Sequence, residues 1–76
     1  MNRHLIDYCI ESFFAGKTVT VFPYVNLPLG KKVIDNKGDY IVLFYHVKTN
    51  RIMCFFKDLE KYWFCWDDIT LYHDKQ

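Results

Sequence analysis

The sequence predicts an α+β domain in which an N-terminal helix packs on a strongly curved antiparallel sheet of four to five short strands. Two observations lead to this prediction. Near the N-terminus apolar residues recur in pairs four residues apart, and residues 38–57, GDYIVLFYHVKTNRIMCFFK, hold two apolar runs separated by a short polar turn. The first pattern is typical of an amphipathic helix and the second of a β-hairpin, which we place at the centre of the fold.

Composition favours one small intracellular domain. The 76 residues are near the lower limit for burying an adequate core, and the aromatic fraction of 20% is more than such a core readily hides. Some aromatic side chains should therefore be exposed. The three cysteines lie in apolar segments and are odd in number, which favours reduced thiols in a cytoplasmic protein. No apolar run approaches the ~20 residues that cross a bilayer, so no membrane association is expected.

The helix is predicted over residues 3–15. Its apolar stripe consists of Leu5, Ile6, Cys9, Ile10, Phe13 and Phe14. Asn2 can serve as the N-cap, and Gly16 can end the helix in the left-handed conformation. A helix of this length is marginally stable alone, so its stripe must dock on the sheet.

The strands are predicted at 18–22, 32–35, 39–47, 51–57 and 62–66, with a last short strand at 69–72. Pro23 cannot donate a hydrogen bond to a ladder, which makes the first strand an edge strand. The second and third strands are joined by a tight turn, in which Gly38 supplies the positive φ that short hairpin loops require. Segment 62–66 could instead form one face of a short helix.

The strand at 39–47 is apolar on both faces, which indicates that both are covered. One side is formed by Ile41, Leu43, Tyr45 and Val47, and the other by Tyr40, Val42, Phe44 and His46. We expect the helix to cover one face and the sheet, curling back on itself, to cover the other. In element order and spacing this meander resembles SH3-like small barrels, including Tudor and Sm-type folds, a resemblance that implies no function.

No motif indicates a catalytic, metal or cofactor site. His4 and Cys9, the closest pair of zinc-ligand types, are five residues apart and do not share a helix face. A cysteine could meet His46 in space, but no nucleophile signature or phosphate-binding glycine loop accompanies them. The adjacent carboxylates of residues 67 and 68 would not flank a substrate. We therefore expect no enzyme activity and no cofactor, and we expect His46 to be satisfied by a local hydrogen bond or to point out at the sheet margin.

The aromatic segment at 62–66 predicts a non-catalytic protein-binding module, because Trp and Tyr dominate binding hot spots. The predicted binding residues are Tyr62, Trp63, Trp66, Asp67 and Asp68. Strand alternation would place residues 62, 64 and 66 on one face and residues 63 and 65 on the other, with one set in the core. A small inhibitor or adaptor of the kind that phages encode, acting on a host or cellular protein, fits this size.

Two other partners are compatible with the sequence. Basic residues near turns, interleaved with aromatic residues, suit single-stranded nucleic acid. They are Lys31, Lys32, Lys37, Lys48 and Arg51. The sequence pI of about 7.7 and the acidic segment 58–74 oppose this alternative. A second copy of the chain could also pair with the edge strand near Thr18–Phe22, forming a homodimer.

Overall fold

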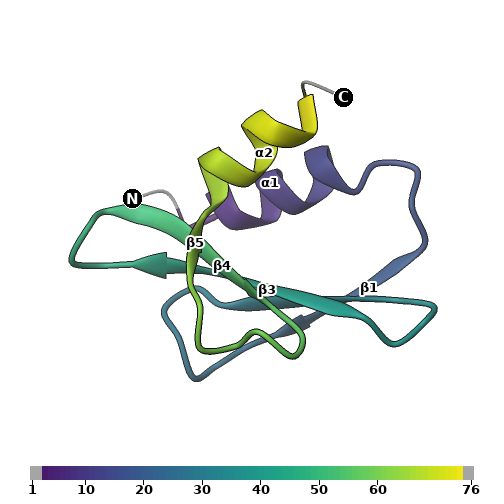
Figure 1. The fold of residues 1–76 in the computed structure, drawn as a ribbon, viewed down its shortest axis with the longest axis horizontal. Helices are drawn as coiled ribbons and strands as arrows, with labels where there is room; N and C mark the ends of the chain where they lie inside the picture. Colours follow the sequence, from purple (N-terminus) through teal and green to yellow (C-terminus); the bar gives the residue numbers. More distant parts are fainter. Residues whose placement is uncertain (1–2, 75–76) are drawn as a thin grey trace.

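The computed structural model describes the backbone of residues 3–74 and the side chains of residues 3–70. In chain order the elements are α1 (Leu5–Phe13), β1 (Val19–Pro23), β2 (Lys31–Asp35), β3 (Tyr40–His46), β4 (Arg51–Phe56), β5 (Phe64–Cys65) and α2 (Trp66–Asp74). The strands form one antiparallel sheet in the order β1-β2-β3-β4-β5, and both helices lie on the same side of it (Figure 1). The predicted α+β class is confirmed.

The first helix forms over the predicted apolar stripe. Ile6 and Ile10, one turn apart, are buried against the sheet. The helix is two residues shorter at each end than predicted. Gly16 adopts φ +77°, the left-handed conformation expected where the helix ends. The predicted N-cap, Asn2, lies outside the described residues.

Strands β1 to β4 begin and end within one residue of their predicted limits. The β2–β3 turn closes because a carboxylate oxygen of Asp35 accepts hydrogen bonds from the backbone N–H groups of Lys37 (2.8 Å) and Asp39 (3.0 Å). Gly38 has φ +84°, as the turn requires. As predicted, β1 is an edge strand that pairs only with β2.

Strand β3 carries two separate cores, one on each face of the sheet. The core on the side of the helices comprises Ile6, Ile10, Val33, Ile41, Leu43, Cys54 and Trp66, and the core on the other side comprises Val42, Phe44 and Phe55. We call these sides the helix face and the loop face. The alternation predicted for the strand is therefore confirmed.

The expectation that the sheet curls back over its own second face is wrong. The strand order is linear, and two connections cover the loop face instead. Tyr24 and Leu27 reach it from the β1–β2 loop (residues 24–30), and Trp63 reaches it from the β4–β5 loop (residues 57–63). Figure 1 shows both loops on the side of the sheet opposite the helices. β1 and β5 are the two ends of the strand order and do not pair with each other in the described part of the chain.

The predicted strand at 69–72 is wrong, because these residues belong to α2. Ile and Thr favour strands, but tertiary contacts override that preference. The Trp66 ring packs edge-on against Phe13 of α1 at 4.9 Å between centroids, and Ile69, one turn later, packs on the same core. Acidic residues occupy the first turn of α2, where the helix dipole favours them.

The predicted strand at 62–66 shrinks to Phe64–Cys65. Tyr62 and Trp63 belong to the β4–β5 loop, and Trp66 begins α2. The predicted alternation therefore fails: the side chain of Trp66 is buried, whereas those of Tyr62 and Phe64 are exposed. In the described part of the chain, neither helix has the length and apolar character that crossing a membrane requires.

Candidate functional site

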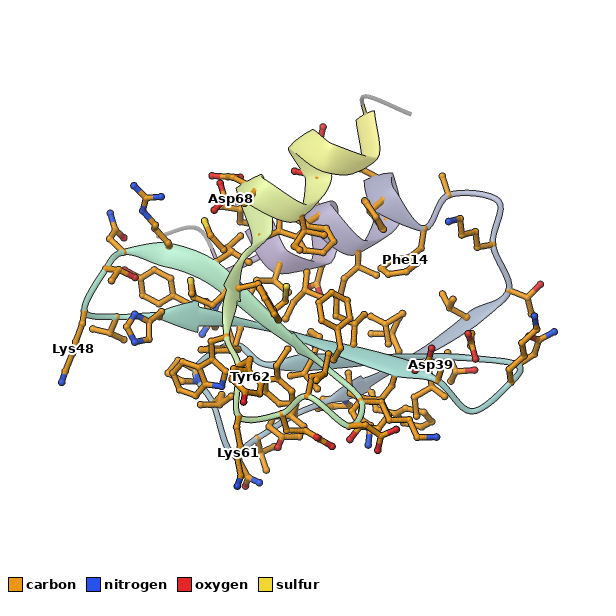
Figure 2. All side chains as sticks on the ribbon, viewed as in Figure 1. Phe14, Asp39, Lys48, Lys61, Tyr62 and Asp68 are labelled. Carbon is orange, nitrogen blue, oxygen red and sulfur yellow. The ribbon has the colours of Figure 1, made fainter. Side chains whose placement is uncertain are left out.

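The five residues predicted to bind a protein are divided between the two sides of the sheet. Trp66 is 4% exposed and belongs to the helix-face core, so it cannot contact a partner. Tyr62 is 63% exposed and Trp63 is 45% exposed. In Figure 2, Asp68 lies beside α2 and Tyr62 lies on the β4–β5 loop across the sheet. The structure thus brings together only Tyr62 and Trp63.

Trp63 is held on one side and open on the other. Its ring meets Phe44 edge-on at 4.7 Å between centroids and His46 at 5.7 Å. The His46 ring is itself fixed by a hydrogen bond between Nδ1 and Thr49 Oγ1 at 2.8 Å, which confirms the local bond predicted for this histidine. These contacts fix the orientation of the Trp63 ring on the loop face.

Tyr62 and Leu59 are two further exposed residues of the loop that carries Trp63. The backbone N–H of Tyr62 donates to the carbonyl oxygen of Leu59 at 2.9 Å, which turns the chain between them. Both side chains are exposed. We call Leu59, Tyr62 and Trp63 the aromatic patch.

The β4–β5 loop is tied to the sheet through Glu60. The Glu60 carboxylate accepts a hydrogen bond of 2.7 Å from the Tyr40 hydroxyl. The ring of Tyr40 is in turn contacted by Lys32, whose ammonium lies 4.0 Å from the ring centroid. The hydrogen bond from Tyr40 lowers the pKa of Glu60, and the bond to Glu60 raises the pKa of Tyr40. Glu60 therefore places a negative charge in the loop that carries the aromatic patch.

Asp67 and Asp68 do not border this patch. Both lie in the first turn of α2, on the side of the helices. Both interact electrostatically with Arg51, whose guanidinium donates to Sγ of Cys65 at 3.8 Å. That bond is the main cause of a raised Arg51 pKa, and the two aspartates add to it. The acids thus partly balance a cation that was predicted to bind nucleic acid.

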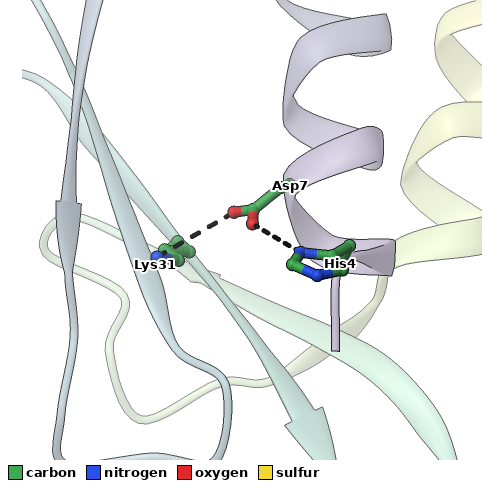
Figure 3. Close-up of polar contacts among 3 residues, drawn as sticks. All are labelled: His4, Asp7 and Lys31. Carbon is green, nitrogen blue, oxygen red and sulfur yellow. Dashed lines mark ion pairs between the residues drawn. The ribbon is translucent and has the colours of Figure 1, made fainter. Parts of the chain in front are cut away.

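The other predicted nucleic-acid residues are dispersed. Lys31 and Lys32 are neighbours on β2, so their side chains point to opposite faces. Lys31 lies on the helix side, with Nζ 3.9 Å from Oδ1 of Asp7, and Asp7 also lies 3.9 Å from His4 Nδ1 (Figure 3). Lys32 lies on the loop side over Tyr40.

Lys48 and Lys37 are also far from each other. Lys48 lies in the β3–β4 turn with Arg51 close by, and Lys37 lies in the β2–β3 turn. Successive hairpin turns occupy opposite ends of an antiparallel sheet. Figure 2 shows this separation through Lys48 and Asp39, which lies two residues after Lys37. No single strand of nucleic acid could follow all five residues along one groove.

All three cysteines are free thiols, and two of them, Cys9 and Cys54, pack in the helix-face core. Burial raises the pKa of Cys54 to about 12, and burial followed by the charge of Asp67 raises that of Cys9. Both pack on the helix face, whereas His46 lies on the loop face, so the structure does not bring them together. Among the described residues, no group of three or more metal-ligand side chains is close enough to hold an ion.

Two surfaces have no counterpart in the sequence predictions. One is the loop face itself, because no local pattern shows that a loop folds under a sheet. The other is an open hollow of about 800 Å³ between the start of α1 and the β1–β2 loop, where His4, Asp7 and Lys31 lie. Its lining offers charged and hydrogen-bonding side chains and contains no cysteine, serine or threonine.

No protein-family model matches the chain, and neither a curated protein nor a solved structure is significantly similar to it.

Proposed function

We propose that the protein is a non-catalytic interaction module that binds another protein through the aromatic patch. The observation that supports this proposal is the state of Trp63, whose ring packs on Phe44 while 45% of the residue remains exposed. A tryptophan that serves only the core is buried, as Trp66 is. Rigid, half-exposed aromatic side chains are the groups that most often provide binding energy in protein interfaces.

The charges around the patch favour a protein over a nucleic acid. Glu60 lies beside it in the loop, and its pKa is lowered, so it is ionised at neutral pH. Asp58 is exposed two residues before it, and Lys61 is the one basic residue between Asp58 and Trp63. Phosphate groups would be repelled here. The expected partner surface has an apolar pocket that receives the indole and basic groups at its rim.

The test compares two exposed aromatic positions. Immobilised wild-type protein, Trp63→Ala and Tyr8→Ala are incubated with the cytosol of the source cells. Tyr8 is the matched control, because it is an exposed aromatic residue on α1, far from the patch in the sequence and on the helix side. The proposal predicts a protein retained by the wild type and by Tyr8→Ala but lost with Trp63→Ala. Equal retention by all three forms contradicts it.

Fluorescence provides a second measurement with the purified partner. The chain has two tryptophans, so Trp66→Phe leaves Trp63 as the only indole emitter. On partner binding we expect a blue shift of Trp63 emission and protection from acrylamide, because the exposed half of the ring leaves water. Unchanged emission in a complex that still forms would place the interface elsewhere.

The alternative, binding to single-stranded nucleic acid, is tested on Lys48 and Arg51, which lie together at the β3–β4 turn. This alternative predicts affinity for oligonucleotides that falls steeply with salt and is lost in the double variant Lys48→Glu, Arg51→Glu. The protein-binding proposal predicts no such affinity in either form.

A further inference from the structure

The two edges of the sheet differ in how they are protected. β5, at one edge, has two residues and is followed directly by α2. β1, at the other, has five residues, and all but the first are exposed. Residues 18–30 contain no charged side chain. Natural edge strands are usually shortened, charged or covered against pairing with another chain. β1 is neither short, charged nor covered, and its one protective residue is Pro23, which removes a donor from the free edge at the end of the strand.

The alternation of hydrogen bonds along β1 shows which of its backbone groups are not bonded to β2. The Tyr24 N–H donates to the carbonyl oxygen of Gly30 at 2.8 Å. In an antiparallel ladder every second residue bonds to the same neighbour. Thr20 and Phe22 therefore bond to β2, whereas Val19, Val21 and residue 23 direct their backbone groups away from the sheet.

Pro23 is one of the residues whose backbone groups point away from β2. Its missing N–H falls on the free edge, so no ladder bond to β2 is lost. The outward donors of β1 are consequently the N–H groups of Val19 and Val21, and the outward acceptors include the carbonyl oxygens of residues 19, 21 and 23. This set can pair with itself.

We propose that a second copy of this chain pairs with β1 in an antiparallel arrangement centred on Val21. The two Val21 residues exchange both of their hydrogen bonds, and the Val19 N–H of each copy donates to the Pro23 carbonyl of the other. Both outward N–H groups of β1 are then satisfied, and the carbonyl oxygen of Val19, which stands opposite the absent N–H of Pro23, is left without a donor. The result is a continuous ten-stranded sheet with the helices of both copies on one side.

The side chains are compatible with this register. Val21, which is 43% exposed, stands opposite its own equivalent, and Phe22, which is 47% exposed, stands opposite Thr20 of the other copy. Aromatic and β-branched pairs of this kind stabilise antiparallel strands. The nearest charge, Lys17, falls opposite Val25, so no like charges meet. An unrelated extended peptide could also add to the edge, but self-pairing needs no other chain and uses all the outward donors.

The first test measures mass as a function of concentration by analytical ultracentrifugation. The wild type should reach twice its 9.2 kDa chain mass as concentration rises. Val21→Lys, which sets two ammonium groups opposite each other, should remain at 9.2 kDa at the same concentrations. The matched control is Val47→Lys, at an exposed valine beside the β3–β4 turn, and it should dimerise as the wild type does. A wild type that stays monomeric throughout contradicts the proposal, and so does a dimer that Val21→Lys leaves intact.

An experiment with opposite charges at position 21 tests the register. Because each variant should be monomeric alone and dimeric in the mixture, a folding defect cannot explain the expected result. Val21→Lys and Val21→Glu should each be monomeric, and their mixture should form a heterodimer, because the register places position 21 opposite itself. The Val47→Lys and Val47→Glu pair should show no preference for the mixed dimer. Failure of the position-21 mixture to dimerise, with both variants folded by circular dichroism, overturns the register.

Amide hydrogen exchange gives a direct backbone measurement on the unmodified protein. The N–H groups of Thr20 and Phe22 should be protected at every concentration, because they bond to β2. Those of Val19 and Val21 should become protected only as the dimer forms. Protection of all four that does not depend on concentration contradicts the proposal. None of these residues belongs to the aromatic patch, so the dimer and the proposed function can fail separately.

Discussion

The helix face and the loop face of the sheet are both apolar but are covered by different kinds of structure. On the helix face, α1 and the start of α2 bring side chains at helical spacing, and Ile6 and Trp66 are almost completely buried. On the loop face, irregular segments bring Tyr24, Leu27 and Trp63. A helix can direct its whole apolar stripe inward, whereas a loop turns some of its apolar residues outward. Tyr62 and Trp63 are therefore exposed on the loop face, whereas the exposed Tyr8 of α1 lies outside the apolar stripe of its helix.

The largest expected effect is on the helix face. Trp66→Ala should cost about 3–5 kcal/mol of unfolding free energy, because it removes a buried aromatic side chain and leaves a cavity beside Phe13. A small domain typically has about 5–15 kcal/mol in total, so the variant should be close to unfolding. Urea denaturation followed by circular dichroism measures the change. Trp66→Phe, which retains part of the ring volume, should lose less.

The next effect is at Gly30, in the loop that covers the second face. A Cβ here would lie 2.3 Å from the backbone oxygen of Tyr24, which forces the loop to shift. Gly30→Ala should therefore cost about 1–3 kcal/mol. Asn26→Ala, in the same loop and exposed, serves as the control and should change stability little. Equal stability of Gly30→Ala and wild type would show that this loop is not a tight cover.

Trp63→Ala should cost much less than Trp66→Ala, although both remove an indole. The substitution forfeits the edge-on contact with Phe44, a type of pair worth about 0.5–1.5 kcal/mol, and creates no enclosed cavity. Paired urea titrations of the two variants measure the difference. If Trp63→Ala proved as destabilising as Trp66→Ala, the ring would be a core residue and the contrast between the two faces would fail.

The smallest effect concerns the exposed bond between Tyr40 and Glu60. Tyr40→Phe should raise the pKa of Glu60 towards its ordinary value, because the hydroxyl no longer donates to the carboxylate. In the wild type the pKa of Glu60 is lower in the folded state than in the unfolded state, where it is about 4.3. The bond therefore stabilises the fold at a pH above the unfolded-state pKa, and this stabilisation is lost as the pH falls through the folded-state pKa. Nuclear magnetic resonance titration of the Glu60 carboxyl measures the shift. Tyr62→Phe, at an exposed tyrosine of the same loop, should leave it unchanged.

Local patterns predicted most of the secondary structure. The helical stripe around Ile6 and Ile10 and the turn closed by Asp35 and Gly38 depend on residues close in the sequence, so periodicity and turn chemistry were sufficient. Segment 69–72 was predicted wrongly for the opposite reason. Its Ile and Thr favour a strand. A helix forms there instead because it lets Trp66 and Ile69 pack in the core beside α1.

The candidate site was only partly predictable. The segment 62–66 marked the right part of the chain, but Trp63 and Trp66 could not be ranked by exposure, because burial depends on which surface each ring meets. Asp67 and Asp68 directly follow the aromatic residues in the sequence, but the start of α2 places them on the other side of the sheet.

By itself the sequence determined the order of helix and strands, the two apolar faces of β3 and the neutral first strand, since period, turn residues and charge are local properties. Only the tertiary structure decided that loops cover the second face, that Trp66 is buried and Trp63 exposed, and which backbone groups of β1 are unpaired. These outcomes depend on contacts between segments distant in the chain, whose geometry no local pattern encodes.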